Sequence, residues 1–327
     1  MHAIRQHEFG PAENLRYEVV PEPVPGADQV RVDVEAAGVH LIDTRIRAGE
    51  AGGPYPLPDL PMTPGREVAG RVGAVGPGVD EAWIGRRVVA HLGMASGGYA
   101  ERAVADVSSL HEIPDDLAPE TAVAAIGTGR TAQGILEVAE LTAKDVAMVT
   151  AAAGGLGALL VQAVRQAGGD VVGLAGGADK VETVRRQGAT AAVDYRRPGW
   201  PDRVRAALGD RQPTVLLDGV GGDAGRAAFD LLGPGGRAVL FGSSSGSPLE
   251  FTSSDLYARG LSASFAIGPR MLQRPGGLRE LETRALDEAA AGRLVPLVGR
   301  TFPLADAAAA HRALETRATT GKVVLVP

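Results

Sequence analysis

The stretch DVAMVTAAAGGLGALLVQAVRQAG, from Asp145 to Gly168, joins a short apolar run, a cluster of small residues and an apolar pattern with helical spacing. AMVT predicts a strand, AAAGGLG a tight turn and ALLVQAVRQAG a helix. Because the turn carries no large side chain, another group can approach its backbone closely. A strand–turn–helix unit also presents free backbone N–H groups and the positive end of a helix dipole to an anion.

The spacing within this turn is that of the dinucleotide fingerprint G-x-G-x-x-G, with an alanine in the first position: Ala152-x-Gly154-x-x-Gly157. We expect Gly154 to let a pyrophosphate approach and Gly157 to let the helix close on the strand. Further along the chain, apolar runs alternate with helical patterns at intervals of roughly 20 to 25 residues. This alternation is typical of a doubly wound parallel sheet, so the fold class is α/β.

The two ends of the chain have a different texture. The segment QVRVDVEAAGV alternates apolar and polar residues, and pieces such as EVAGRVGAVGPGV and GGYAERAVA are broken by glycine and proline, as in β-rich domains. The last part contains two helical patterns and a closing strand, KVVLVP. We expect residues 1–118 and 270–327 to form one domain, to which the closing strand returns, and residues 119–269 to form the other.

Composition excludes several classes of function. The chain has no cysteine, which rules out disulfides, iron–sulfur clusters, thiolate zinc sites and a cysteine nucleophile. Its formal charge is −6, and the basic residues are scattered, so we expect no nucleic-acid partner. No stretch approaches the ~18 apolar residues of a membrane span, and the first residues contain no signal-like apolar segment. We therefore expect no membrane partner and a cytoplasmic location.

The strand after the small-residue turn indicates which dinucleotide is bound. NAD-binding units usually place an acidic residue at the end of this strand, where it accepts hydrogen bonds from the ribose hydroxyls. Here the strand ends in Leu174, Ala175 and Gly176, and Lys180 follows. A cation without a competing carboxylate suits a 2′-phosphate, so NADP(H) is favoured. We expect Asp179 to cap the next helix rather than bind ribose.

Several segments of the sequence together resemble those of a known family. The segments that carry the likeness are AAGVHLIDTRIRAG, PGREVAGRVGAVGPGV, GTGRTA, AAAGGLG, GATAAVDYR, LDGVGG, GRAVLFGSSSG and ATTGKVVLVP. Together they resemble the zinc-free quinone oxidoreductases, the ζ-crystallin-like branch of the medium-chain dehydrogenase/reductase superfamily. The resemblance covers essentially the whole chain. It implies a GroES-like catalytic domain, a Rossmann domain inserted within it, and NADPH as the cofactor.

The resemblance also implies which residues bind the cofactor. The pyrophosphate would lie on Ala153, Gly154, Gly155, Leu156 and Gly157. The 2′-phosphate would be surrounded by Gly176, Lys180 and Tyr195. The ribose and nicotinamide would be lined by Val220, Gly221, Gly242, Ser243, Ser244, Phe265, Ala266 and Ile267. Thr131 and Lys322 would complete the cofactor side of the site.

The same comparison predicts that no metal is bound. Metal-dependent relatives carry a histidine where this chain has Arg66, and its six histidines contain no i, i+4 pair. Without a Lewis acid to stabilise an alkoxide, the substrate must itself be a strong electrophile, as quinones and α,β-unsaturated carbonyls are. The candidate catalytic residues, which would donate to the developing oxyanion, are His40, Arg45, Tyr55 and Thr131. Family members commonly have asparagine and tyrosine where His40 and Arg45 stand.

Three other functions are considered. An enoyl-thioester reductase would have a similar fold, and a catalytically weak NADP(H)-binding redox sensor would also fit the atypical His40 and Arg45. The segment GSSSG at 242–246 is similar to a hydrolase nucleophile elbow, with Ser244 as the nucleophile. Because acid and base partners are not evident later in the chain, the hydrolase is disfavoured. The family further implies a small-molecule substrate and a homodimer.

Overall fold

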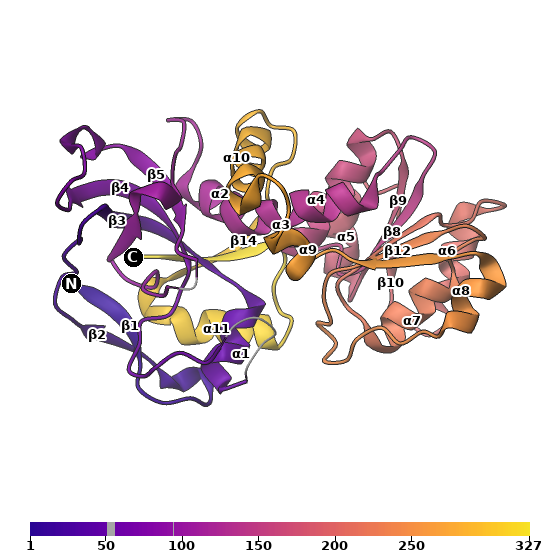
Figure 1. The fold of residues 1–327 in the computed structure, drawn as a ribbon. Helices are drawn as coiled ribbons and strands as arrows, with labels where there is room; N and C mark the ends of the chain where they lie inside the picture. The colour runs from indigo at the N-terminus through magenta and orange to yellow at the C-terminus, as the bar shows by residue number, and fades with distance from the viewer. Residues whose placement is uncertain (51–55, 94) are drawn as a thin grey trace. The chain divides into compact units, whose positions relative to one another are not determined.

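The computed structural model describes residues 1–50, 56–93 and 95–327 (Figure 1). They form two compact units, one of Met1–Gly129 with Glu282–Pro327 and one of Arg130–Leu281. The sequence placed the domain boundaries earlier, after residues 118 and 269. The difference arises because the helical segment after residue 118 buries Val123 and Ile126 against the first unit. The functional division into catalytic and cofactor domains stays a prediction.

The second unit is built on a six-stranded sheet in which every pair of neighbours is parallel. Its strand order is β10-β9-β8-β11-β12-β13. The strands are β8 (Val146–Val149), β9 (Asp170–Ala175), β10 (Ala191–Asp194), β11 (Val215–Asp218), β12 (Arg237–Leu240) and β13 (Ser262–Phe265). This is the doubly wound order, and its direction reverses between β8 and β11, where such sheets bind ligands at the carboxyl ends of the strands.

Helices cover both faces of this sheet. Because side chains alternate along a strand, Val146 and Met148 of β8 join one core, and Ala147 and Val149 join the other. One face packs against α3 (Arg130–Ala139), α4 (Gly155–Gln166) and α5 (Ala178–Arg186). The other packs against α6 (Trp200–Leu208), α7 (Gly222–Asp230) and α8 (Ser253–Arg259). The short α9 (Pro269–Leu272) follows β13.

The first unit contains a seven-stranded sheet that is mostly antiparallel. Its path is β14-β15-β3-β4-β5-β7, with β6 also paired to β3. The strands are β3 (Gln29–Val39), β4 (Glu67–Val75), β5 (Arg87–His91), β6 (Arg102–Asp106), β7 (Leu110–Glu112), β14 (Val298–Pro303) and β15 (Lys322–Val326). The closing strand β15 pairs with β3, so the end of the chain does return to this unit. A separate hairpin pairs β1 (His2–Gln6) with β2 (Leu15–Val19).

Helices flank this sheet on two sides. They are α1 (Leu41–Ala48), α2 (Pro119–Ala124), a π-helical turn at Ala125–Gly129, α10 (Gly277–Ala290), whose first residues belong to the second unit, and α11 (Ala307–Glu315). Short 3₁₀ turns lie at Ala12–Asn14, Glu81–Trp83, Val107–Ser109 and Leu304–Asp306. Among the described residues, no helix is both long enough and apolar enough to cross a membrane.

Candidate functional site

The small-residue turn of the second unit lies between the end of β8 and the start of α4. Ala151 adopts the left-handed region at φ 48°, and the backbone N–H of Ala152 donates to the Leu174 carbonyl of β9 at 3.0 Å. A Cβ on Gly157 would lie 2.3 Å from the Ala151 oxygen and 2.6 Å from the Ala152 Cα. Only glycine therefore allows the first turn of α4 to pack this closely on the turn.

The outer side of the same turn is open. Gly154 precedes α4 with extended backbone angles, φ −81° and ψ 173°. Of the residues that the structure describes, a Cβ placed on it would meet within 4 Å only the Ala151 oxygen, at 3.2 Å. The first N–H groups of a helix have no acceptor within the helix, and they carry the positive end of its dipole. The open backbone and the helix N-terminus together fit a diphosphate.

The corner after β9 is narrow and basic. A Cβ on Gly176 would lie 3.4 Å from the Tyr195 hydroxyl, and a Cβ on Gly177 would lie 2.5 Å from Nη2 of Arg196. Gly177 itself has φ 104°. The structure thus brings Tyr195 beside Gly176, as the resemblance implied, and adds Arg196. Arg196 was not predicted, although the two arginines that follow VDY in the sequence are a signal for a basic site.

Asp194, the last residue of β10, ties this corner together. Its Oδ1 accepts from the backbone N–H of Gly177 and of Arg196, at 3.0 Å each. Burial alone would raise the pKa of Asp194, but these two hydrogen bonds and the nearby arginines lower it. The Asp194 carboxylate therefore accepts hydrogen bonds from the backbone N–H groups of this corner. Asp179 lies in the first turn of α5, at the helix N-terminus as expected, but the N-cap residue is Gly177 and no side chain caps the helix.

The point where the strand order reverses is fixed by Asp218, which is fully buried at the end of β11. Its carboxylate accepts from the Thr150 hydroxyl at 2.7 Å and from the backbone N–H of Val220 and Gly221 at 3.0 Å. Burial raises the pKa of Asp218. The loop after β12 joins this arrangement, since the Ser244 N–H donates to the Gly219 carbonyl at 3.1 Å. Asp218 therefore fixes the loops that follow β8 and β11 through these hydrogen bonds.

The structure brings most of the predicted cofactor residues to one edge of the sheet. They lie at or after the carboxyl ends of the six parallel strands: Ala153, Gly154, Gly155, Leu156, Gly157, Gly176, Lys180, Tyr195, Val220, Gly221, Gly242, Ser243, Ser244, Phe265, Ala266 and Ile267. Thr131 lies in the first turn of α3 of the same unit and is half-buried.

A second cluster lies in the first unit, where three neighbouring strands meet. His40 is the single residue between β3 and α1, Glu67 begins β4 and Lys322 begins β15. Because β3 pairs with both β4 and β15, the three side chains converge. Lys322 Nζ lies 2.7 Å from Glu67 Oε2 and 2.8 Å from His40 Nε2, which in turn lies 2.6 Å from Glu67 Oε1.

Burial differs sharply within this cluster. The side chain of Glu67 is 0% exposed and that of Lys322 is 4% exposed, whereas that of His40 is 25% exposed. Burial would raise the pKa of Glu67, but His40 and Lys322 hold it well below its usual range. Burial lowers the pKa of Lys322, and Glu67 opposes that shift. Lys322, predicted on the cofactor side, thus has its contacts with Glu67 and His40.

Asp43 connects His40 to a second buried group of side chains. One carboxylate oxygen accepts from the His40 backbone N–H at 2.9 Å and from the Tyr99 hydroxyl at 3.2 Å, and the other accepts from Arg66 Nη2 at 3.0 Å. The Tyr99 hydroxyl also lies 3.3 Å from Nε2 of His311. Burial lowers the pKa of His311 to about 4, so this imidazole is neutral at pH 7.

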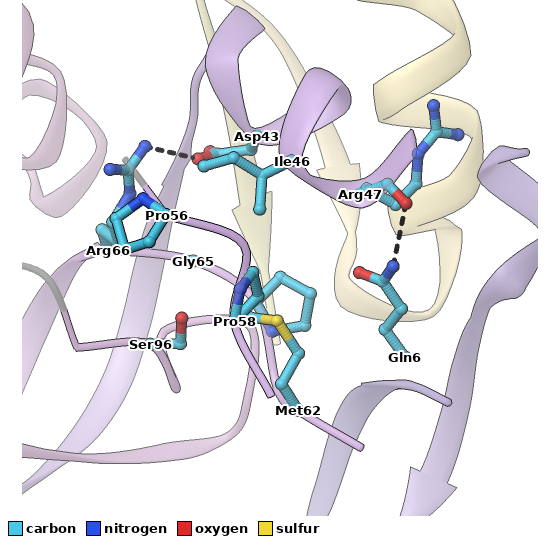
Figure 2. A pocket seen from close by; sticks show the side chains of 11 residues that line it. Gln6, Asp43, Ile46, Arg47, Pro56, Pro58, Met62, Gly65, Arg66 and Ser96 are labelled. Atoms are coloured by element: carbon cyan, nitrogen blue, oxygen red, sulfur yellow. Dashed lines mark hydrogen bonds and ion pairs between the residues drawn. The ribbon is translucent and has the colours of Figure 1, made fainter. Parts of the chain in front are cut away.

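A cavity of about 50 Å³ opens beside this network in the first unit. Figure 2 shows Arg66 and Asp43 joined by their hydrogen bond at one edge, with Ile46 of α1 projecting beside them. The lining residues are Gln6, Asp43, Ile46, Arg47, Pro56, Pro58, Met62, Pro64, Gly65, Arg66 and Ser96. Arg66 was not predicted to line a cavity, although its position is one that differs from metal-dependent relatives.

The remaining predicted catalytic residues are placed as follows. Arg45 lies in α1 and is half-buried. Tyr55 lies outside the described residues. Glu67 was not predicted, although its position at the start of a predicted strand, directly after Arg66, marked it as a charged residue entering a sheet. Among the described residues, no group of three or more histidine, aspartate or glutamate side chains is placed to hold a metal ion.

Comparison with known proteins agrees with this geometry. Residues 26–115 match a family described as the alcohol dehydrogenase GroES-like domain, and residues 187–325 match one described as zinc-binding dehydrogenase. A 2-haloacrylate reductase of a Burkholderia species is 32% identical, covering 98% of this chain and 97% of that protein. A quinone oxidoreductase of Pseudomonas aeruginosa is 33% identical, with the same two coverages.

The chain belongs to the zinc-free quinone oxidoreductases. This branch of the medium-chain dehydrogenase/reductase superfamily is the one that the sequence motifs indicated, and that prediction is confirmed, as is the fold of a GroES-like unit with a Rossmann-like parallel sheet. A mycobacterial protein, solved in complex with NADPH, matches with a TM-score of 0.86 at 34% identity, each chain being covered completely. As a quinone oxidoreductase relative over its full length, the chain is a reductase of this superfamily.

Proposed function

We propose that this reductase transfers hydride from NADPH to a quinone or another α,β-unsaturated carbonyl compound. The observation that carries the proposal is the full-length likeness to a quinone oxidoreductase and a 2-haloacrylate reductase, whose names both denote conjugated electrophiles. In both kinds of substrate, a conjugated system takes up the charge that hydride addition creates. No metal is needed to stabilise an alkoxide in such a reaction.

The cofactor is held by the second unit. The backbone of Ala153, Gly154, Gly155, Leu156 and Gly157 binds the diphosphate at the N-terminus of α4. Lys180 and Tyr195, together with Arg196, surround the 2′-phosphate after β9 and β10. The loops held by Asp218 and the residues after β12 and β13 position the nicotinamide. Bound NADPH supplies the hydride, and the protein supplies orientation.

His40 is the proposed donor to the substrate oxygen. It is the one member of its cluster whose side chain is substantially exposed, and its Nε2 contacts Glu67 and Lys322. A side chain held in one orientation loses little entropy when it meets a ligand. Arg45, Tyr55 and Thr131 are the other proposed catalytic residues. Thr131 and Lys322 are assigned from the family resemblance.

The test is a screen of NADPH oxidation at 340 nm. Purified protein is mixed with 1,4-benzoquinone, 2-cyclohexen-1-one, a 2-alkenal and crotonyl-CoA in turn. Faster oxidation with the quinone, enone or alkenal than with crotonyl-CoA supports the proposal. A preference for crotonyl-CoA would identify an enoyl-thioester reductase instead. Tight NADPH binding without oxidation by any compound would identify a redox sensor.

A cytoplasmic location and a homodimer are further proposals from the family resemblance. Light scattering on the purified protein tests the dimer, because a monomer would have a mass near 33.5 kDa. Fractionation of cells that express the chain tests the location.

A further inference from the structure

The basic corner of the second unit is formed by two loops that are distant in sequence. Gly177 lies in the loop after β9, and Arg196 lies in the loop after β10. The two strands are parallel neighbours, and Ala175 at the end of β9 lies opposite Asp194 at the end of β10. Gly177 and Asp194 are 17 residues apart, so the chain between them does not by itself fix one loop against the other.

A single carboxylate oxygen joins the two loops. Asp194 Oδ1 accepts from the backbone N–H of Gly177 and from that of Arg196, at 3.0 Å each. The second of these bonds is the local turn that an aspartate forms with the backbone two residues further on. The side chain of Asp194 is 13% exposed. This mostly covered carboxylate therefore acts on the two loops.

The bond to Arg196 fixes where its guanidinium begins. A Cβ on Gly177 would lie 2.5 Å from Nη2 of Arg196, so the arginine side chain lies directly on the glycine backbone. Its Nε is 3.8 Å from Asp194 Oδ1, and the side chain is 66% exposed. The guanidinium is thus held close to one position and is still accessible to a ligand.

The bond to Gly177 fixes the start of α5. Gly177 has φ 104° and is the residue directly before the helix. The first turn of α5 carries Asp179 and Lys180. If the Gly177 peptide turned, this first turn would move relative to Arg196.

Net charge alone gives the corner little selectivity for a phosphate. The loops carry three cations, Lys180, Arg196 and Arg197, and two carboxylates, Asp179 and Asp194. These leave one net positive charge, and water and salt screen the charges of exposed side chains. Charge-assisted hydrogen bonds to a phosphate are strong when the donors point at its oxygens. The orientation of the cations therefore decides how well the corner binds a 2′-phosphate.

We propose that Asp194 is a positioning residue for cofactor selectivity: by holding Gly177 and Arg196 together, it orients the corner for the 2′-phosphate of NADPH and so favours NADPH over NADH. The inference rests on the proposed placement of NADPH at this corner. NAD-binding units carry an acid at the end of the strand that corresponds to β9, where it binds the ribose. Here the acid lies one strand away, and it binds backbone N–H groups instead.

The test separates the geometry of Asp194 from its charge, with the Kd for NADPH and for NADH measured by calorimetry. Asp194→Asn loses the charge and keeps an oxygen that accepts from both N–H groups. Its preference for NADPH should stay within about threefold of that of the unchanged protein. Asp194→Glu keeps the charge but moves the carboxylate by one methylene, and Asp194→Ala removes it. Both should lower the preference at least about tenfold, through a higher Kd for NADPH, as the loss of one charge-assisted contact implies.

Asp170→Ala is the matched control. Asp170 begins β9 at the opposite edge of the same sheet, where it accepts from the Thr190 hydroxyl at 3.0 Å. Its loss changes the charge of the unit by the same amount and should leave the preference for NADPH within about threefold. Urea unfolding of the cofactor-free proteins shows which variants are folded. If Asp194→Ala does not fold, the comparison of Asp194→Asn with Asp194→Glu decides.

Three outcomes would overturn the inference: a fall in preference of less than tenfold in Asp194→Glu, an equal fall in Asp194→Asn and Asp194→Glu, or a parallel loss of affinity for both cofactors. The last result would assign Asp194 a purely structural role. None of these measurements depends on turnover. A protein that shows the expected Kd values but oxidises NADPH with no quinone or enone would leave the inference standing and remove the proposed function. Quinone reduction by a protein that binds NADPH and NADH equally would do the reverse.

Discussion

Two glycines of the small-residue turn, Gly154 and Gly157, are expected to have different roles, one in cofactor binding and the other in packing. We expect Gly154→Ala to weaken NADPH binding without destabilising the fold, and Gly157→Ala to do both. The distinction follows from what a new methyl group would meet. Among the described residues, the Ala151 oxygen at 3.2 Å is the only neighbour within 4 Å of a Cβ on Gly154, whereas at Gly157 backbone atoms lie at 2.3 and 2.6 Å.

The expected magnitudes follow from these contacts. Backbone cannot move aside as the end of a flexible side chain can, so Gly157→Ala should cost about 1–3 kcal/mol of unfolding free energy, the range for overpacking. Gly154 has extended backbone angles that alanine adopts freely. Its replacement should leave the cofactor-free protein equally stable, or about 0.4–1 kcal/mol more stable through the unfolded state.

The effect on affinity is of a different size. The methyl group of Gly154→Ala would project from the open side of the turn, where the diphosphate is proposed to lie. Loss of one charge-assisted hydrogen bond costs about 1.5–3 kcal/mol, which raises the Kd for NADPH by about 10- to 150-fold. The Kd is measured from the quenching of protein fluorescence or by calorimetry, and stability is measured by urea unfolding of the cofactor-free protein.

Either of two results would refute this reasoning. If Gly154→Ala bound NADPH as the unchanged protein does, the open side of the turn would not be the place where the diphosphate lies. If Gly157→Ala kept full stability, the close packing of α4 on the turn would not need glycine. Gly235 has φ 72°, and no atom of the described part of the chain lies within 4 Å of a Cβ added there, so Gly235→Ala gives the cost of backbone strain alone.

Three further predictions concern the buried charges and the 2′-phosphate. His311 is fully buried and its pKa is lowered to about 4, so folding is favoured above about pH 6.5, and this contribution, about 3 kcal/mol, is lost as pH falls toward 4. In urea unfolding at several pH values, the free energy of unfolding should therefore fall less steeply with acid in His311→Gln than in the unchanged protein. An equal fall in both proteins would contradict this prediction. Glu67→Gln should lower the free energy of unfolding by about 3–5 kcal/mol, measured by thermal or urea unfolding, because Lys322 is left buried without its carboxylate partner. The double variant Glu67→Gln/Lys322→Met should recover part of that free energy, and an equal loss in the single and double variants would contradict the pairing. The double variant Lys180→Ala/Arg196→Ala should raise the Kd for NADPH at least about tenfold and leave that for NADH unchanged, whereas a parallel loss for both cofactors would show that these residues do not contact the 2′-phosphate.

Much of the cofactor side was predictable because it depends on local sequence. The order of strand, small-residue turn and helix from Val146 to Gln166 follows from apolar periodicity and glycine spacing alone. In a parallel sheet, the loops that follow the strands all lie at the same edge, whatever their composition. Residues that follow each strand, such as Val220 and Ser244, could thus be assigned to that edge without knowledge of their contacts.

The first unit was harder to predict because its contacts join distant parts of the chain. Lys322, His40 and Glu67 meet because β15 inserts beside β3, a pairing between residues more than 280 positions apart. Nothing in the local sequence of Lys322 distinguishes a buried partner of Glu67 from a cofactor ligand. The same applies to Arg66, whose position on a cavity depends on the loop that carries Pro58 and Met62.

The measurement that tests the account most directly is a crystal structure of the protein with NADPH bound. We predict that the diphosphate oxygens lie within hydrogen-bond distance of the backbone N–H groups of Gly155 and Leu156 at the start of α4. The 2′-phosphate should lie beside Lys180 and Arg196. A cofactor bound away from this turn, or bound with its diphosphate on another loop, would contradict the account.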